Sequence, residues 1–334
     1  MSGSDLPPLR YLSAADVEAA MPPLAERLRL AELTMTGLVA DAELPAKIAV
    51  HPRPDGSFAH AMPAYLRGPE ITGDRLGMKW VAGFGTNSAI GLPAISALIV
   101  LNDATTGLPV ALLDGGPVTA QRTAAVSGVA IARFRPTVGG RPTTAALIGS
   151  GVQGRAHLAV LGAVLPGVDL RVFDRHEDRA AALVAEAGRT AGIGAASAAP
   201  SARGAIENAD VVVTAASFTS PDRRQVMTSD WLAPDALVVA VDYATYCSAE
   251  VAREATLFLV DHRDQFLAIR DTGAFDGYPD PTMTIGEALL GNVARPRHGR
   301  VVVTHLGVGL ADVVFGAAIL EAATERGLGT TLPR

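Results

Sequence analysis

The sequence predicts an α/β fold with two domains, and three observations support this prediction. An apolar run ending at Ile148 leads directly into the glycine-rich segment Gly149-Ser-Gly-Val-Gln-Gly154. From there to about residue 305, short aliphatic runs alternate with helical periods, which is the pattern of a parallel, doubly wound sheet. Upstream, short strand-like runs are joined by Asp-Gly, Gly-Pro and Thr-Gly turns, which favour hairpins. A chain of 334 residues is long enough for both domains.

The glycine-rich segment has the spacing of a dinucleotide-binding turn. In the pattern G-x-G-x-x-G, Gly149 permits a tight turn, Gly151 lets the backbone approach a pyrophosphate, and Gly154 lets the next helix pack closely on the strand. An apolar strand precedes the segment and an amphipathic helical period follows it, as the motif requires. We therefore expect a Rossmann-type doubly wound parallel sheet that binds dinucleotide phosphates at a helix N-terminus.

Asp174 ends the next apolar run, residues 169–174, and indicates which dinucleotide binds. A carboxylate at this strand end accepts hydrogen bonds from a ribose 2′-hydroxyl and repels a 2′-phosphate, so the sequence predicts NAD. Arg175 and Arg179 follow closely and could attract such a phosphate, which keeps NADP as an alternative. The structural alternative for Asp174 is an N-cap of the helix that starts near Glu177.

The upstream part of the chain predicts a smaller α+β domain. Residues 14–39 have a helical period, with Ser13 as a candidate N-cap. Five strand-like runs follow, at residues 47–50, 57–61, 76–81, 95–101 and 109–114. The turns between them favour an antiparallel sheet, and a helix over residues 119–133 leads into the next domain.

The downstream part continues the parallel sheet. Its further strand-like runs are residues 210–215, 237–243, 256–261 and 300–305. The Ala-rich stretch 191–205 predicts a surface strand and helix, and the last helix, residues 310–326, stops at Gly327. Because that helix follows the final strand of the sheet, it is free to pack on the first domain. We expect one domain from residues 1–121 with 309–334, and a second from residues 122–308.

The composition argues against several classes of protein. A net charge of −6 and a pI near 5.7 disfavour a nucleic-acid or anionic-membrane surface, which needs a clustered basic face. The single cysteine, Cys247, excludes an intrachain disulfide and fits a reducing compartment. The seven histidines show no metal-ligand spacing, so no metal is expected. No uncharged apolar run reaches the roughly 18 residues of a membrane span, and the N-terminus lacks a signal pattern. We expect a cytoplasmic protein with no membrane or nucleic-acid partner.

Three cations of the first domain are candidates for binding an anionic substrate. Lys79 interrupts a strand, where a buried ammonium needs a partner, so it either meets a bound carboxylate or lies exposed on the strand. Arg122 stands near the start of its predicted helix, where an ordinary solvated arginine is the favoured alternative. Lys47, after Pro45, is the third.

Asp242 is the candidate proton carrier. It ends the apolar run that begins at Leu237, and the carboxyl ends of strands in doubly wound sheets face the ligand crevice. An enzyme that uses a nicotinamide needs such a group to move protons while hydride moves. A cap or turn residue is the equally favoured structural alternative. Cys247 has no identifiable histidine partner, so we expect no nucleophilic role for it.

Several motifs together resemble the ornithine cyclodeaminase/mu-crystallin family over nearly the whole chain. The Thr-x-x-Arg-Thr-Ala motif that contains Arg122 is fairly specific to that family. The other motifs are His60-Ala-Met-Pro-Ala-Tyr65, Gly77-Met-Lys-Trp-Val81, Gly91-Leu-Pro-Ala-Ile-Ser96, Leu101-Asn-Asp-Ala-Thr-Thr-Gly107, Gly149-Ser-Gly-Val-Gln-Gly154 and Gly307-Val-Gly-Leu-Ala-Asp312. The resemblance implies that the first domain binds substrate and forms a homodimer, with the last helix returning to it.

The resemblance also implies the roles of individual residues. Asp242 is the implied acid/base and, with Lys79, the expected catalytic pair. Lys79 and Arg122 are the implied ligands of a substrate carboxylate. The implied substrate side also includes Lys47, Met62 and His305. The expected cofactor-binding residues are Thr123, Gly149, Gly151, Val152, Gln153, Gly154, Asp174, Arg175, Ala215, Ser217 and Val241.

Three departures separate the chain from the cyclodeaminase pattern. Lys47 replaces an arginine and loses its planar fork, the loop Tyr243–Ala249 is longer and more aromatic, and His305 lies in Thr304-His-Leu-Gly where the family shows Thr-x-Phe-Lys-Ser. The expected function is an NAD(P)-dependent oxidoreductase that transfers hydride at the carbon of an α-amino or imino acid. Two alternatives stay open: an ornithine- or lysine-type cyclodeaminase that releases ammonia with NAD recycled, and a non-catalytic, mu-crystallin-like small-molecule binding protein.

Overall fold

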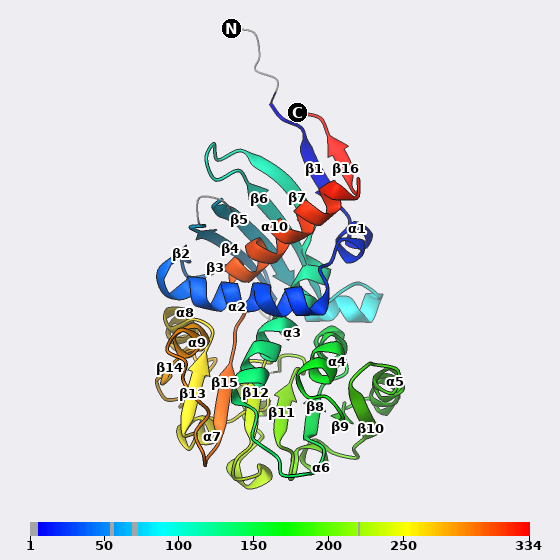
Figure 1. Cartoon of the computed structure of the whole chain (residues 1–334), viewed down its shortest axis with the longest axis vertical. Coiled ribbons are helices and arrows are strands. Elements are labelled where there is room, and N and C mark those ends of the chain that lie inside the picture. The colour runs from blue at the N-terminus through cyan, green and yellow to red at the C-terminus, as the bar shows by residue number, and fades with distance from the viewer. Residues whose placement is uncertain (1–5, 54–56, 69–72, 220) are drawn as a thin grey trace. The chain divides into compact units, whose positions relative to one another are not determined.

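The chain forms two compact units, which are drawn in Figure 1. The first unit contains residues 1–122 and 308–334, and the second contains residues 123–307. The structure is a computed structural model that describes residues 6–53, 57–68, 73–219 and 221–334. In these ranges, no helix combines the length and the apolar character that crossing a membrane requires.

The first unit is a mixed sheet covered by helices. Its strands are β1 (Leu9–Leu12), β2 (Ala42–Glu43), β3 (Ile48–Val50), β4 (Phe58–Leu66), β5 (Arg75–Gly83), β6 (Ile95–Asn102), β7 (Pro109–Asp114) and β16 (Thr330–Leu332). The described strands lie in the order β16-β1-β7-β6-β5-β4-β2, with β3 also paired to β4. The run from β4 to β7 is antiparallel, as predicted, whereas β1 pairs parallel with β7.

Two long helices of the first unit pack together. Helix α10 (Gly309–Glu325) contacts β4, β5 and β6, and it also packs on α2 (Leu24–Ala40) (Figure 1). The last helix of the chain therefore belongs to the first unit. Its end is as predicted, because Gly327 has a φ of +67°, in the left-handed region that favours glycine.

The predicted single helix over residues 14–39 is wrong, because two helices occupy this stretch. Helix α1 (Ala14–Ala19) begins at the predicted cap, where the Ser13 side chain accepts a hydrogen bond from the N–H of Asp16 in a capping box. Helix α2 then starts at Leu24. Pro22 and Pro23 separate them, because proline lacks the N–H that a helix interior needs and its ring clashes with the preceding turn.

The second unit is a parallel sheet, which confirms the predicted doubly wound α/β fold. Its described strands lie in the order β10-β9-β8-β11-β12-β15-β13-β14, and every pair is parallel. The strands are β8 (Thr144–Ile148), β9 (Val168–Phe173), β10 (Ile193–Ala198), β11 (Val211–Thr214), β12 (Leu237–Ala240), β13 (Leu257–Val260), β14 (Met283–Thr284) and β15 (Val301–Thr304). The helices are α4 (Val152–Val164), α5 (Glu177–Ala187), α6 (Ala202–Ile206), α7 (Ala249–Arg253), α8 (Arg263–Arg270) and α9 (Ile285–Leu290). Helix α3 (Gly115–Phe134) precedes them and contains the predicted helix 119–133.

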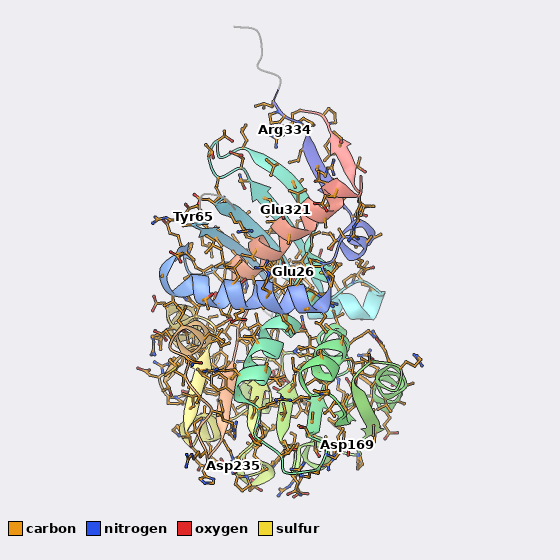
Figure 2. The ribbon with its side chains drawn as sticks, in the orientation of Figure 1. Glu26, Tyr65, Asp169, Asp235, Glu321 and Arg334 are labelled. Carbon is orange, nitrogen blue, oxygen red and sulfur yellow. The ribbon has the colours of Figure 1, made fainter. Side chains whose placement is uncertain are left out.

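The core of the second unit explains why its central strands were recognisable. Every residue of β11, β12, β13 and β15 is buried, and these strands consist almost entirely of valine, leucine and alanine. Parallel strands covered on both faces produce such continuous apolar runs. Figure 2 labels Asp169 and Asp235, which lie at the amino ends of β9 and β12. Charged residues of this kind mark the edge opposite to the one that carries the candidate site.

Candidate active site

The strand order of the second unit brings four predicted segments to one edge of the sheet. The chain leaves β8 toward β9 on one side and returns on the other side at β11, so β8 and β11 flank the point where the strand order reverses. Ligands of open α/β sheets bind at the carboxyl ends of the strands at such a point. Along the order β8-β11-β12-β15, the segments that follow these strands are the glycine turn, Ala215 to Ser217, Asp242 and His305.

The three glycines of the turn have the geometry that the motif requires. Gly149 has a φ of +104°, and a Cβ there would collide with the backbone at Ala215. A Cβ on Gly154 would collide with the carbonyl of Gly149, so helix α4 could not pack as closely on the turn. A Cβ on Gly151 would meet no atom within 4 Å, so the backbone there faces open space. Gly149 and Gly154 are therefore required by the fold, whereas Gly151 leaves room for a ligand.

The same turn fits the phosphates of a dinucleotide. Helix α4 begins at Val152, and its N-cap, Gly151, has no side chain to accept a hydrogen bond from the first turn. The free N–H groups and the helix dipole favour an anion at this end. The Ser150 hydroxyl is buried and has no hydrogen-bond partner among the described residues. A bound pyrophosphate would satisfy these donors, so the residues present fit the expected cofactor.

Asp174 is anchored to the glycine turn. One carboxylate oxygen accepts a hydrogen bond from the N–H of Ser150 at 2.8 Å, and the other accepts one from the N–H of His176 at 3.0 Å. The alternative that Asp174 caps the next helix is wrong, because α5 begins at Glu177 with His176 as its N-cap. Arg175 is exposed directly beside Asp174.

Asp242 lies two residues beyond the end of β12 and is buried, with 1% of its surface exposed. Its carboxyl accepts a hydrogen bond from the Thr214 hydroxyl at 2.8 Å and one from the N–H of Ala216 at 3.2 Å. Burial raises the pKa of Asp242 to about 7, and the two hydrogen bonds oppose that rise. A carboxyl with this pKa can both give and accept a proton near neutral pH. Its side chain bonds to the segment of the neighbouring strand β11 and caps none of the described helices. Its backbone carbonyl accepts a hydrogen bond from the N–H of Thr245, so Asp242 also begins a turn, as the structural alternative held.

His305, which follows β15, is also buried. Its Nε2 lies 2.8 Å from the Ser127 hydroxyl, which in turn lies 2.8 Å from Nε2 of His157. Because Ala240 at the end of β12 pairs with Thr304 at the end of β15, Asp242 and His305 follow adjacent strand ends.

Three further predicted cofactor residues of the second unit follow strands at this edge, and two lie in helices. Ala215 and Ser217 follow β11, Val241 follows β12, and Thr123 is buried in α3. The N–H of Ala215 bonds to the carbonyl of Ile148, and the N–H of Val241 bonds to that of Thr214, so both extend the sheet pattern beyond the strands. Gln153 lies in the first turn of α4.

In the first unit, the candidate substrate residues share one face of the sheet. Met62 on β4 pairs directly with Lys79 on β5, and Lys79 pairs with Ile99 on β6. Directly opposed residues of neighbouring strands point to the same face. Lys47 immediately precedes β3, whose register runs from Ile48 opposite Ala61 and therefore continues toward Met62. This face is the one that α10 covers, since a Cβ on Gly309 at the start of α10 would collide with the carbonyl of Met62.

Lys79 and Arg122 are both buried against a carboxylate that the sequence analysis did not assign to the site. The Nζ of Lys79 lies 2.7 Å from Oδ2 of Asp312, and the Nε of Arg122 lies 3.2 Å from Oδ1 of the same residue. Lys79 is 1% exposed, so the alternative of an exposed strand lysine is wrong. Arg122 is buried in the second turn of α3, so the alternative of a solvated arginine is wrong as well.

Asp312 had a signal in the sequence that could have identified it. It is the single charged residue between Gly309 and Leu320, in a stretch of α10 that is otherwise aliphatic, aromatic or glycine. A carboxylate buried in such a helix needs a cation as its partner, and Lys79 and Arg122, once buried, need an anion. The pairing was hidden because Arg122 and Asp312 are 190 residues apart in the chain.

The cations on this face lower the pKa values of the bases beside them. Burial, then the charge of Arg122, lowers the pKa of Lys79 to about 7, while Asp312 opposes the shift. Burial, together with the charges of Lys47, His51 and Lys79, lowers the pKa of His60 to about 4. Two cations around one carboxylate leave a surplus of positive charge that an anionic ligand would neutralise.

Cys247 carries no chemistry in this arrangement. It is buried in the second unit, and burial raises the pKa of its thiol to about 12. A thiol with so high a pKa is a poor nucleophile at neutral pH.

A Rossmann-type unit with an intact dinucleotide turn and a buried carboxyl of raised pKa, together with a unit that holds a buried cation pair, defines a nicotinamide-dependent oxidoreductase. The chain belongs to the ornithine cyclodeaminase/mu-crystallin family, whose model matches residues 13–327. The resemblance inferred from the sequence motifs is thereby confirmed.

Three relatives illustrate the range of this family. The chain is 35% identical over 333 residues to the nodulation efficiency protein NfeD of Rhizobium meliloti, covering 97% of this chain and 98% of that protein. It is 26% identical over 271 residues to the ketimine reductase mu-crystallin of Mus musculus, covering 79% of this chain and 80% of that protein. Among solved structures, Thermococcus litoralis Δ1-pyrroline-2-carboxylate reductase in complex with NADH and L-proline has a TM-score of 0.82 at 25% identity, covering 96% of this chain and 99% of that one.

Proposed function

We propose that the protein is an NAD-dependent oxidoreductase that transfers hydride at the nitrogen-bearing carbon of a small α-amino or α-imino acid. The observation that carries the proposal is Asp242, a buried carboxyl with a pKa of about 7 at the carboxyl edge of a dinucleotide-binding sheet. When bound, NAD supplies the hydride acceptor, or NADH the donor, at the nicotinamide ring. The family membership of the chain and the solved relative with NADH and L-proline support the same reaction class.

The substrate carboxylate is bound by Lys79 and Arg122. These side chains share the single carboxylate of Asp312, so they retain positive charge for a second anion. Asp312 uses one oxygen for each cation and thereby holds both side chains in place before substrate arrives. Lys47 adds positive potential, which helps to keep His60 neutral, and Met62 contributes an apolar wall to the same face. The charge balance of the first unit supports the roles predicted for these residues.

Asp242 exchanges a proton with the substrate nitrogen. In the oxidative direction, the carboxylate takes a proton from the amine as the carbon loses hydride. In the reductive direction, the protonated carboxyl gives that proton to the imine nitrogen as the carbon gains hydride. Because the pKa of Asp242 is about 7, both protonation states are present at neutral pH. The Thr214 hydroxyl and the Ala216 amide orient the carboxyl for either direction.

The cofactor is NAD, with its pyrophosphate at the N-terminus of α4 and its ribose hydroxyls on Asp174. The hydrogen bond from Ser150 to Asp174 ties the carboxylate to the phosphate-binding turn, which favours a ribose 2′-hydroxyl over a 2′-phosphate. Arg175 keeps NADP as the second candidate.

An absorbance screen at the nicotinamide band tests the reaction class. NADH is mixed with cyclic imino acids or with pyruvate plus amines, and NAD is mixed with free amino acids. We expect net NADH consumption with at least one imine, or NADH production with the corresponding amino acid. The matched control is Asp242→Asn, which should bind cofactor but show little turnover.

Two other outcomes of the screen would support different functions. Ammonia release from ornithine or lysine without net change in NADH would favour a cyclodeaminase. Lys47 and His305 are the departures that argue against this variant, since each replaces a residue type expected in the cyclodeaminase pattern. Cofactor binding with no turnover and no ammonia in any mixture would favour a binding protein.

We further propose that the protein is a homodimer formed through the outer face of the first sheet. On that face, Ile48 lies beside Ala61, Ala61 lies opposite Trp80, and Trp80 lies opposite Leu98. Ile48, Trp80 and Leu98 are 64%, 44% and 44% exposed in the single chain. A contiguous apolar row of this kind marks an interface, and a second copy of the chain is the partner that the family resemblance implies. A cytoplasmic location fits the single buried thiol of Cys247.

A further inference from the structure

A buried chain of hydrogen bonds in the second unit connects the dinucleotide-binding turn to His305. It begins at the carbonyl of Gln153, which lies 2.7 Å from Nδ1 of His157. Nε2 of His157 lies 2.8 Å from the Ser127 hydroxyl, and the same hydroxyl lies 2.8 Å from Nε2 of His305. All three side chains are buried, with exposed fractions of 0% for Ser127 and His157 and 2% for His305. The proposed reaction has no role for Ser127 or His157.

The positions of the hydrogens in this chain follow from one fixed acceptor. The Gln153 carbonyl can only accept, so Nδ1 of His157 must carry a hydrogen. Burial lowers the pKa of His157 to about 4, so the ring is neutral near pH 7 and its Nε2 has a lone pair. The Ser127 hydroxyl therefore donates its one hydrogen to His157. Its oxygen is left as the acceptor toward His305, so Nε2 of His305 must be the donor.

We infer that Ser127 and His157 are positioning residues that hold His305 with its hydrogen on Nε2, so that His305 can accept a proton or a hydrogen bond only at Nδ1. The donor-to-acceptor direction of all these hydrogen bonds is set by the backbone of the glycine turn, because the first acceptor is the Gln153 carbonyl. Reversing it would place the lone pair of His157 Nδ1 against the lone pairs of that carbonyl at 2.7 Å. The arrangement thus selects one of the two tautomers of a neutral His305 ring.

The position of His305 indicates how its tautomer would matter in the reaction. This role depends on the proposed function. His305 and Asp242 follow the adjacent strand ends of β15 and β12. A neutral His305 with an Nδ1 acceptor favours substrates whose nitrogen carries an N–H, such as a primary amine or a protonated cyclic imine. A tertiary or N-substituted nitrogen has no hydrogen to offer to this acceptor. His305 would therefore be a specificity-determining residue, and Ser127 would act through it.

Nitrogen NMR of protein labelled with ¹⁵N-histidine tests the tautomers directly and requires no turnover. We expect His157 to show a protonated Nδ1 and His305 a protonated Nε2 at pH 7. The signals are assigned by their loss in His157→Gln and His305→Gln. A His305 ring with its hydrogen on Nδ1 would overturn the inference even if the enzyme is fully active, and the expected tautomers would stand even if the proposed reaction failed.

Substitutions at Ser127 test the positioning role. Ser127→Ala removes the hydroxyl that links the two rings, so the His305 signals should shift toward a mixture of tautomers. Ser127→Thr keeps the hydroxyl and should restore them. The matched control is Ser248→Ala, which removes another buried serine hydroxyl of the same unit, the N-cap of α7. It should leave the His305 signals unchanged. If Ser127→Ala leaves the tautomer of His305 as it was, the positioning role is overturned.

A kinetic comparison follows from the same variants. The loss of one hydrogen bond typically changes a rate or equilibrium constant by about tenfold. Ser127→Ala should therefore lower kcat/KM for substrates with an N–H by about tenfold. Cofactor affinity should stay close to that of the unmodified protein, and Ser127→Thr should recover the activity. Equal losses in Ser127→Ala and Ser248→Ala would instead indicate a general effect on folding and would contradict the specificity role.

Discussion

At the scale of single residues, the burial of Asp242 changes its chemistry more than its sequence position does. An aspartate in water is ionised at neutral pH, whereas this one is removed from solvent and its pKa is raised to about 7. The Thr214 hydroxyl holds the carboxyl in one orientation. A carboxyl with this pKa suits the proton transfer that we propose for it.

Replacing Asp242 by asparagine should lower kcat by roughly 10² to 10⁴ while cofactor binding is retained, because the amide keeps the shape and loses the proton. In the unmodified enzyme, the reductive rate should fall as pH rises through about 7, since the protonated carboxyl is required. The oxidative rate should rise over the same range. Steady-state rates across pH 5 to 9 check both limbs, and a near-normal kcat in Asp242→Asn would move the role to His305.

Arg122→Met should raise KM for the substrate roughly 10- to 100-fold, because the variant removes a charge-assisted hydrogen bond to the carboxylate. The dissociation constant for NAD should change little, since the assigned cofactor turn lies in the second unit. Initial rates give KM for the substrate, and titration followed by fluorescence gives the dissociation constant for NAD. Weaker cofactor binding with an unchanged KM would show that Arg122 serves the other ligand.

Asp174→Ala should narrow the preference for NAD over NADP, because the carboxylate both accepts from the ribose and repels a 2′-phosphate. Titration of the two cofactors into the unmodified protein and the variant measures the change. An unmodified protein that binds NADP as tightly as NAD would show that Arg175 outweighs Asp174.

At the scale of elements, α10 contributes more than cover for the sheet. It follows the last strand of the second unit in sequence and packs on β4, β5 and β6 of the first. This return places Asp312 between Lys79 on β5 and Arg122 on α3. The helix thus supplies the counter-charge for two cations that lie about 190 to 230 residues earlier in the sequence. The glycine at the start of α10 makes this close packing possible.

Asp312→Asn should destabilise the protein by about 3 to 5 kcal/mol, because it leaves two buried cations without their shared carboxylate. Urea unfolding followed by circular dichroism measures the loss. The matched control is Glu321→Gln on the exposed side of the same helix, which is labelled in Figure 2 and should change stability by less than about 0.5 kcal/mol. Similar stabilities of the two variants would show that Lys79 and Arg122 do not depend on Asp312.

At the scale of the whole molecule, the same sheet of the first unit serves two purposes on its two faces. The row that contains Met62 and Lys79 lies under α10, whereas the adjacent row of Ala61, Trp80 and Leu98 faces outward. The alternation of side chains along a strand separates the charged site from the apolar surface by a single residue. A dimer formed on the outer row would therefore support the strands that carry the site.

Leu98→Lys should shift the protein from dimer to monomer, because an ammonium group at the β6 end of the outer row would lose its water if the interface formed. Light scattering coupled to size exclusion measures the mass. Leu290→Lys is the matched control, since Leu290 is also an exposed leucine but lies in the second unit. A dimer that persists in Leu98→Lys would place the interface elsewhere.

The sequence by itself determined the features that depend on neighbours along the chain. The glycine turn, the Asp174 carboxylate and the buried strands were identifiable because turn geometry and apolar periodicity are local. Even here, Pro22 and Pro23 divided a helix that its period alone predicted to be continuous. The resemblance to family motifs then supplied the expected roles of Lys79, Arg122 and Asp242, which spacing alone could not assign.

Only the tertiary structure decided how the charges of these residues are balanced. Whether Lys79 is exposed, and whether Arg122 is solvated, depended on Asp312, which lies far away in the sequence. The hydrogen-bond chain through Ser127 and His157 to His305 likewise joins residues from three separate segments. The physical reason is that pKa values, ion pairs and tautomers are set by what surrounds a group in space, and packing brings those surroundings together only when the chain folds.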